Sequence, residues 1–291
     1  MRSLSILLTA QLVCLCSCNR LPGTDRDSEE EATRTLDEMS TEQLRVFLKG
    51  YVGDWREDTD QSRGIPEPPF LKDVPQDGVT IDLAKPATLS LGDAPLVDMI
   101  VQRRSTRQFS RAPLDNNELS LLLWCTQGIS ETVRGETGEV LHYLRTVPSG
   151  GARHPFETYL AINRVDGIRP GIYRYLPGTH SLLLVESPSD LPAIMTRLCY
   201  GQAYAGEAAV VFIWAATPYR TEWRYGYIAH RMIAMDAGHV CQNLYLAAES
   251  IGSGVCAMLA YDQEGMDTLI GVDGNNEFAI YLAAVGKKRI E

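Results

Sequence analysis

The sequence predicts an α+β fold, in which helices pack on a central sheet. Apolar runs with the two-residue period of strands and apolar stripes with a helical period both occur, without regular alternation along the chain. With 291 residues, the chain is long enough for one large core. Its net charge of -10 argues against nucleic acid as a partner, because phosphate binding needs a basic surface.

Residues 1–18 have the features of an export signal. Arg2 carries positive charge, residues 4–13 form an apolar stretch too short to span a bilayer stably, and small or thiol residues follow. The run ending at Cys18 resembles a bacterial lipoprotein signal, which implies that this cysteine is acylated and that the exported protein is anchored to a bacterial membrane. An ordinary secretory signal, cleaved nearby, is the alternative.

Residues 19–39 are expected to form an acidic tether, because they lack the apolar content that offsets chain entropy. A helix and an extended arm are expected over residues 40–94. Ser40 and Gln43 fit a capping box, and apolar residues at helical spacing carry this helix to about Val52. Prolines between residues 66 and 95 break any long element, which predicts an arm laid over the domain or over a partner subunit.

The compact domain is expected to span residues 95–291, beginning with a helix over about 95–104. A second helix begins at Asp115, where Glu118 completes a capping box, and it ends at Gly128. A long helix with one apolar stripe ends near Gly252. Strand patterns cover residues 156–163, 171–176, 181–186, 208–217, 255–261 and 278–285, and the second and third of these form a hairpin.

The cysteines of the domain lie in apolar surroundings, which favours buried free thiols over disulfides. They are Cys125, Cys199, Cys241 and Cys256. We expect no metal site, because no pair of His or Cys residues has ligand spacing with a matching second pair.

Four motifs occur in an order that matches one protein family. They are RRSTRQF at 103–109, PSGGARHP at 148–155, DAGHVCQNL at 236–244 and GKKR at 286–289. Together they resemble the nitroreductase superfamily, and its SagB-type dehydrogenase branch most closely, over roughly residues 95–289. The resemblance implies a central mixed sheet with flanking helices, an intertwined homodimer, and an FMN site that the two subunits share.

The basic residues of the first and last motifs suit the phosphate of FMN. Arg103 would provide a guanidinium fork, and Lys287 and Arg289 project on one side of a strand end at a spacing of two. Arg104 belongs to the same basic cluster, and Ser105 would hydrogen-bond the ribityl chain or the phosphate. The alternative interpretation of this cluster is a solvated helix end whose cations complement the helix dipole.

Two further segments are expected to reach the flavin through their backbones. Ser149, Gly150 and Gly151 form a loop that can approach a ligand closely, and the resemblance implies that this loop comes from the opposite subunit. The resemblance also implies that Leu259 and Ala260 present backbone amides to the N5 and O4 edge of the flavin. A plain tight turn before a strand is the alternative for the loop.

The candidates for catalysis are weaker. The resemblance places Arg107 near the pyrimidine edge of the isoalloxazine, where a cation stabilises the charge that reduction creates. His239 is a candidate proton donor, although a hydrogen-bonded structural role is favoured because the resemblance places its helix in the dimer core. Tyr200 is the other named candidate, and Tyr204 and Tyr225 are further acids.

If FMN is bound, the flavin transfers hydride and the protein supplies orientation and electrostatics, which predicts a ping-pong oxidoreductase acting on a small molecule or peptide. SagB-type relatives oxidise azolines with a Lys-Tyr pair as the base. This sequence has no adjacent Lys-Tyr, so azoline oxidation and reduction of a quinone or nitro compound both stay open, as does the electron donor. The competing class is a non-enzymatic nitroreductase-like lipoprotein that binds a ligand or acts as a scaffold.

Overall fold

The computed structural model describes residues 39–49 and 58–289. The chain divides into two compact units, Met1–Asp58 and Thr59–Glu291. The predicted signal segment, the predicted acylation site Cys18, nearly all of the predicted tether and the predicted end of the first helix near Val52 lie outside the described residues.

The described part of the first unit contains α3 (Thr41–Leu44), which continues into the short helix η1 (Arg45–Leu48). The Oγ atom of Ser40 accepts a hydrogen bond from the Gln43 amide at 3.2 Å, and the Gln43 side chain accepts one from the Ser40 amide at 2.7 Å. These two bonds confirm the predicted capping box.

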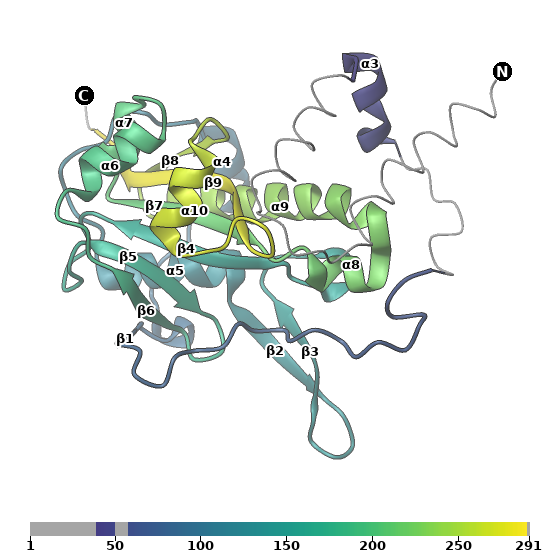
Figure 1. Cartoon of the computed structure of the whole chain (residues 1–291). Coiled ribbons are helices and arrows are strands. Elements are labelled where there is room, and N and C mark those ends of the chain that lie inside the picture. The colour runs from purple at the N-terminus through teal and green to yellow at the C-terminus, as the bar shows by residue number, and fades with distance from the viewer. Residues whose placement is uncertain (1–38, 50–57, 290–291) are drawn as a thin grey trace. The chain divides into compact units, whose positions relative to one another are not determined.

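A seven-stranded sheet forms the centre of the second unit (Figure 1), with the strand order β1-β6-β5-β4-β7-β9-β8. The strands are β1 (Thr80–Asp82), β4 (Phe156–Ile162), β5 (Gly171–Leu176), β6 (Ser181–Glu186), β7 (Val210–Ala216), β8 (Ser253–Met258) and β9 (Phe278–Lys287). The α+β class is confirmed. Every neighbouring pair of these strands is antiparallel. The expected mixed direction is limited to isolated bridges such as Ser105 with Val255, because pairs such as β4–β5 and β5–β6 join chain neighbours by short connections.

Helices cover both faces of this sheet (Figure 1). On one face lie α5 (Asn116–Gln127) and α9 (Ala229–Ser250), and on the other lie α6 (Leu191–Leu198), α7 (Ala203–Glu207) and α10 (Gln263–Ile270). The side chains of β7 show the two-residue period directly. Phe212 and Trp214 join the first core, whereas Val211 and Ile213 join the second. The predicted strand covered on both faces is therefore confirmed.

The predicted helices of the domain occur as α4 (Leu96–Gln102), α5 and α9. Asp115 and Glu118 exchange both hydrogen bonds of the capping box, at 2.8 and 3.0 Å, and α5 ends before Gly128 as expected. The predicted strand over 255–261 is shorter than expected and ends at Met258, so Leu259 and Ala260 follow the strand as exposed residues.

Several elements were not predicted. A two-stranded ribbon of β2 (Ile129–Arg134) and β3 (Val140–Arg145) extends away from the main sheet (Figure 1). Its register shifts twice and its strands are partly exposed, so polar and apolar residues do not alternate strictly. The amphipathic helices α6 and α10 and the short α7 and α8 (Tyr219–Tyr225) were also missed.

The proline-rich arm contacts the domain of its own chain. Its strand β1 pairs with β6, and the Trp223 indole donates a hydrogen bond to the Ile65 carbonyl at 2.8 Å. Further along the arm, the Asp73 carbonyl accepts a hydrogen bond from Arg174 at 2.5 Å. These contacts attach the arm to the sheet and to α8.

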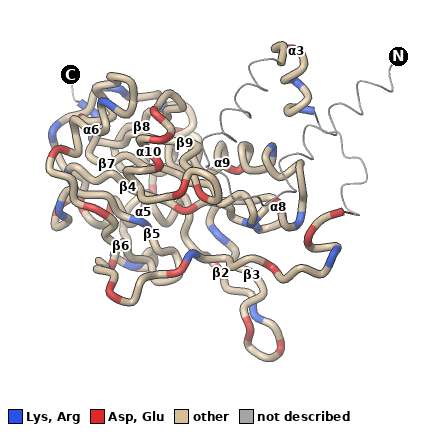
Figure 2. Tube along the Cα trace, in the orientation of Figure 1, with Lys and Arg blue, Asp and Glu red and all other residues tan. Residues whose placement is uncertain are grey.

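The described residues contain four free cysteines: Cys199, Cys241 and Cys256 are buried, and Cys125 is half-buried. Burial raises the pKa of the Cys199 and Cys241 thiols to about 11. Within the same residues, no helix is long and apolar enough to cross a membrane, and no group of His, Cys, Asp or Glu is arranged to hold a metal ion. Acidic and basic residues are interspersed along the chain (Figure 2).

Candidate functional site

The first and last motifs lie next to each other at one end of the sheet. After α4 ends, the chain runs beside β8, where the Thr106 amide donates a hydrogen bond to the Val255 carbonyl at 2.8 Å. Four residues further on it meets the end of β9, where the Ser110 amide donates to the Lys287 carbonyl at 2.9 Å. The fold therefore brings the two predicted basic motifs together.

Tyr245 of α9 organises two of the predicted ligands. The Arg103 guanidinium lies 5.3 Å above its ring, and its hydroxyl is 3.1 Å from the Ser105 Oγ atom. The same hydroxyl accepts a hydrogen bond from the Ala257 amide of β8 at 3.0 Å. Tyr245 was not predicted as part of the site, although it directly follows the third motif.

The other basic residues of the two motifs have different surroundings. Arg104 folds back on α4 and donates hydrogen bonds to the Val101 and Arg103 carbonyls at 3.0 and 2.8 Å, so the helix-end interpretation fits this residue. Lys287 forms an ion pair with Glu118 and also donates to the Ile251 carbonyl at 3.3 Å. Arg289 is exposed at the end of the described chain.

Tyr204 lies near Arg107, close to the strand end that follows β8. Burial and the Cys256 thiol raise the pKa of Tyr204 to about 12, and the positive charge of Arg107 partly opposes this rise. The Tyr204 hydroxyl donates to the Gln202 side chain, which in turn donates to the Ala260 carbonyl at 2.9 Å. A hydrogen-bonded chain thus joins Tyr204, which lies near Arg107 of the first motif, to one of the predicted flavin contacts.

The loop at 148–155 adopts a constrained conformation. It includes the short helix η4 (Gly150–Ala152), and φ is positive at Gly151 (61°), Ala152 (55°) and His154 (46°). A Cβ atom added at Gly151 would lie 2.2 Å from the Tyr225 hydroxyl, so this position combines a left-handed backbone with a close approach.

The substitution Gly151→Ala is expected to destabilise the fold more than Gly167→Ala does. Both glycines have positive φ, but a Cβ atom at Gly167 meets nothing within 4 Å. The Gly167→Ala control therefore measures only the cost of backbone strain. The steric clash at Gly151 adds about 1–3 kcal/mol to the loss of stability in Gly151→Ala. Chemical denaturation of both variants measures the difference, and equal losses of stability would contradict the packing described here.

Arg153 and His154 of the second motif point into the protein. The Arg153 guanidinium lies between the rings of Trp223 and Phe70, at 5.0 and 5.7 Å, and pairs with Glu67 of the arm. Burial and the nearby Arg145 lower the pKa of His154 to about 3. Both residues are therefore part of the interior that supports the loop.

His154 is expected to make the fold sensitive to mild acid. The folded state keeps this imidazole neutral down to a pH of about 3, whereas the unfolded chain takes up a proton below its usual pKa of about 6.5. Stability should therefore fall as the pH drops below about 6.5, by up to about 1.4 kcal/mol per pH unit. In His154→Asn, which tolerates positive φ, unfolding free energies between pH 7 and 4.5 should show a flatter slope. An unchanged slope would show that another group is responsible.

The two named catalytic candidates are exposed. His239 places its Nδ1 atom 3.8 Å from a carboxylate oxygen of Asp236, beyond hydrogen-bonding distance. Tyr200 has a positive φ of 52° at a turn after α6. The contacts described above leave both residues outside the hydrogen-bonded chain that joins Tyr204 to Ala260.

A model of the Nitroreductase family matches residues 100–287, which is more than half of the chain and includes the site described above. The chain belongs to the nitroreductase family. Its fold also resembles solved nitroreductase structures. A nitroreductase from Ralstonia eutropha gives a TM-score of 0.59 at 24% identity, covering 78% of this chain and 100% of that one.

Two relatives refine the placement within the family. The nitroreductase-like protein MJ1384 of Methanocaldococcus jannaschii is 30% identical over 211 residues, which cover 72% of this chain and 98% of that protein. The trifolitoxin-processing protein TfxB of Rhizobium leguminosarum bv. trifolii is 29% identical over 172 residues, 56% of this chain and 46% of that protein. A chain of the Escherichia coli microcin synthetase McbBCD complex, solved with truncated pro-MccB17 bound, shares the fold. The TM-score is 0.53 at 20% identity, and the match covers 72% of this chain and 78% of that one. The similarity to TfxB supports the SagB-type branch, whereas the microcin synthetase chain shows the shared fold alone.

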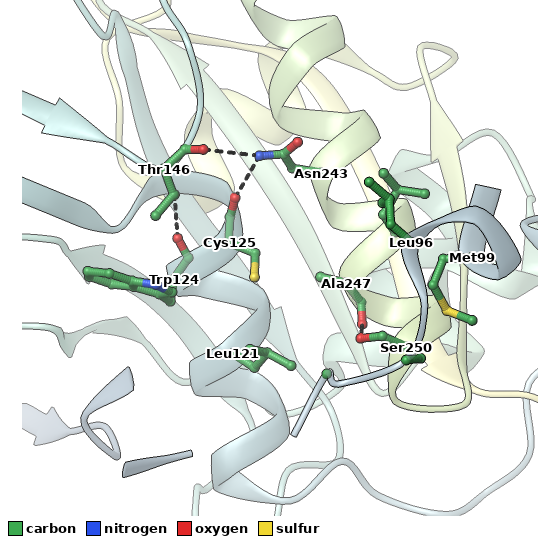
Figure 3. Close-up of a pocket in the computed structure, with 12 residues that line it drawn as sticks. Leu96, Met99, Leu121, Trp124, Cys125, Thr146, Asn243, Ala247 and Ser250 are labelled. Atoms are coloured by element: carbon green, nitrogen blue, oxygen red, sulfur yellow. Dashed lines mark hydrogen bonds between the residues drawn. The ribbon is translucent and has the colours of Figure 1, made fainter. Parts of the chain in front are cut away.

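The described part of the chain also has a pocket whose lining includes none of the predicted cofactor residues (Figure 3). It has a volume of about 350 Å³ and lies between α4, α5 and α9. Its lining is largely apolar and includes Leu96, Met99 and Leu121. Asn243 spans one side, where its amide donates to the carbonyls of Cys125 and Thr146 at 2.9 and 3.4 Å.

Proposed function

We propose that this nitroreductase-family protein is an FMN-dependent oxidoreductase that passes hydride between the flavin and a small-molecule or peptide substrate. The observation that supports this most is the meeting of Arg103, Ser105 and Arg107 with the exposed strand end at one end of the sheet. Arg103 and Arg289 form no ion pair with any residue that the structure describes, so both cations are available to a phosphate.

The residues present fit FMN, whose ring system supplies the hydride chemistry when it is bound. Arg103 and Arg289 would bind the phosphate, and Ser105 would bind the phosphate or the ribityl chain. Arg107 would stabilise negative charge at the pyrimidine edge, and the backbone at Leu259 and Ala260 would face the N5 and O4 edge. Lys287 would contribute to the electrostatic potential of the site without contacting the phosphate directly, because Glu118 already binds its ammonium group.

We infer that the active form is a homodimer in which each site takes its loop from the partner. Within one chain, Asp236 holds the loop and Tyr245 holds the basic motif, and these residues are nine positions apart on α9. Nine helical residues span about 14 Å, so the loop of the same chain lies well away from its own basic motif. Leu96, Val97, Ile100 and Val101 of α4 are each more than half exposed and provide an apolar surface for a second subunit.

Two substrate classes are consistent with the site. TfxB processes a toxin peptide and the McbBCD complex binds a peptide precursor, which favours a peptide substrate by analogy. Reduction of a quinone or nitro compound is the alternative, because the chain lacks an adjacent Lys-Tyr pair. Export and acylation at Cys18 would place either reaction at a bacterial membrane.

Turnover with defined acceptors tests the function. The FMN-loaded protein is reduced anaerobically with NADH or NADPH and then mixed with a quinone, a nitroaromatic compound or an azole precursor peptide. An oxidoreductase should be reoxidised by at least one acceptor over many cycles. A protein that retains FMN but turns over none of them would instead support the non-enzymatic binding module.

A further inference from the structure

The loop that carries Ser149, Gly150 and Gly151 has a conformation that the backbone does not favour by itself. Three of its residues have positive φ, and two of them, Ala152 and His154, are not glycine. Left-handed backbone at residues other than glycine costs about 1–3 kcal/mol for each position and persists only where the surroundings impose it. Some group outside the loop must therefore hold it.

Asp236 of α9 provides three contacts that hold this loop. Its carboxylate accepts a hydrogen bond from the Ser149 hydroxyl at 2.5 Å, and the Gly150 amide lies 3.2 Å from both carboxylate oxygens. Asp236 is only 5% exposed, so these bonds replace water around a buried carboxylate. The Nδ1 atom of His239 lies 3.8 Å from one of the carboxylate oxygens.

The hydroxyl of Ser149 is used entirely within the protein. It donates its one proton to Asp236 and accepts a hydrogen bond from the His154 amide at 2.9 Å. A hydroxyl has a single proton, so Ser149 has no donor left for a ligand. Through these two bonds, Ser149 before the left-handed segment and the His154 amide at its end are both linked to the buried Asp236 carboxylate.

We propose that Asp236 is a positioning residue for the flavin, acting through Ser149 to hold the 148–155 loop in its binding conformation. This inference rests on the proposed function and refines it: the loop contributes its backbone to the flavin, and Ser149 acts as an internal clamp rather than as a direct ligand. Asp236 and Ser149 then form one unit, and removing either one should have the same effect.

A double-mutant cycle on FMN affinity tests this coupling. The dissociation constant of FMN is measured by quenching of flavin fluorescence for the full chain, Ser149→Ala, Asp236→Ala and the double variant. Each single variant should bind FMN at least about tenfold more weakly, and the double variant should be no worse than the weaker single variant. Losses that multiply would show that Ser149 binds the flavin independently, and unchanged affinity in Asp236→Ala would overturn the proposal.

The chain offers a matched control in Asp267 of α10. This carboxylate is also buried and accepts a backbone hydrogen bond, from the Ala279 amide at 2.7 Å, together with one from the Gln263 side chain at 2.8 Å. Asp267→Ala should lower stability but leave FMN affinity unchanged. If Asp236→Ala does not fold, Asp236→Asn keeps the volume and one acceptor oxygen and should give a smaller loss of the same kind.

Hydrogen exchange separates failure of this inference from failure of the proposed function. Without FMN, the amides of Gly150 and His154 should exchange faster in Asp236→Asn than in the unmodified chain, and Asp267→Asn should leave them protected. Faster exchange in a protein that rejects FMN would keep the clamp but overturn its role in flavin binding. Unchanged exchange would overturn the clamp itself.

Discussion

Replacing Arg103 and Arg107 together with alanine is expected to abolish FMN retention while the protein stays folded. Neither arginine forms an ion pair with the described residues, so their loss leaves no buried carboxylate unpaired. A charge-assisted hydrogen bond contributes about 1.5–3 kcal/mol, which corresponds to about 10- to 150-fold in affinity for each arginine. Desalting after incubation with FMN measures retention.

Arg111→Ala is the matched control, because Arg111 is an exposed arginine of the same segment outside the proposed ligand set. It should retain FMN like the unmodified protein. Full retention by the Arg103 and Arg107 double variant would contradict the phosphate and pyrimidine assignments. Lys287→Ala, at another predicted phosphate ligand, is a less suitable test, because it would leave the Glu118 carboxylate without its cation and lower stability as well.

The second large effect is expected from Arg220→Ala. Arg220 pairs with Glu157 at 2.6 Å, and both side chains are only 5% exposed. Removing one partner of a buried ion pair leaves an uncompensated charge, which costs about 3–5 kcal/mol. The loss should be seen as a lower midpoint in denaturant unfolding, without a change in slope.

A more exposed contact of the same helix provides the comparison. Glu222 of α8 lies 2.7 Å from the Nε2 atom of His230 of α9, whose side chain is 62% exposed, so Glu222→Ala should cost less than about 1 kcal/mol. Similar losses of unfolding free energy in Arg220→Ala and Glu222→Ala would show that burial of the Arg220–Glu157 pair does not determine its contribution to stability.

Local signals predicted the elements whose sequence pattern is complete within a short window. The capping box at Asp115 and Glu118 identified α5, and the continuous apolar run of β7 indicated a strand covered on both faces. The ribbon of β2 and β3 was missed because its register shifts break the alternation of polar and apolar residues. The helices α6 and α10 were missed because each has only 8 residues. Short amphipathic helices depend on packing more than on local propensity.

The site was predicted less completely, because its decisive contacts join distant residues. Motif order identified Arg103, Ser105 and Arg107, which the fold does bring to one end of the sheet. The pairing of Lys287 with Glu118 spans 169 residues, and that of Ser149 with Asp236 spans 87. No periodicity or spacing in the sequence reports such contacts, so the use of Lys287 and Ser149 within the protein became visible only in three dimensions.

The visible absorption spectrum of the purified chain, before and after incubation with excess FMN and desalting, tests the central claim most directly. The account predicts a retained flavin band at about one flavin per chain, because each chain supplies one basic motif and one loop. A colourless protein that rejects FMN would contradict it and would support the non-enzymatic module instead.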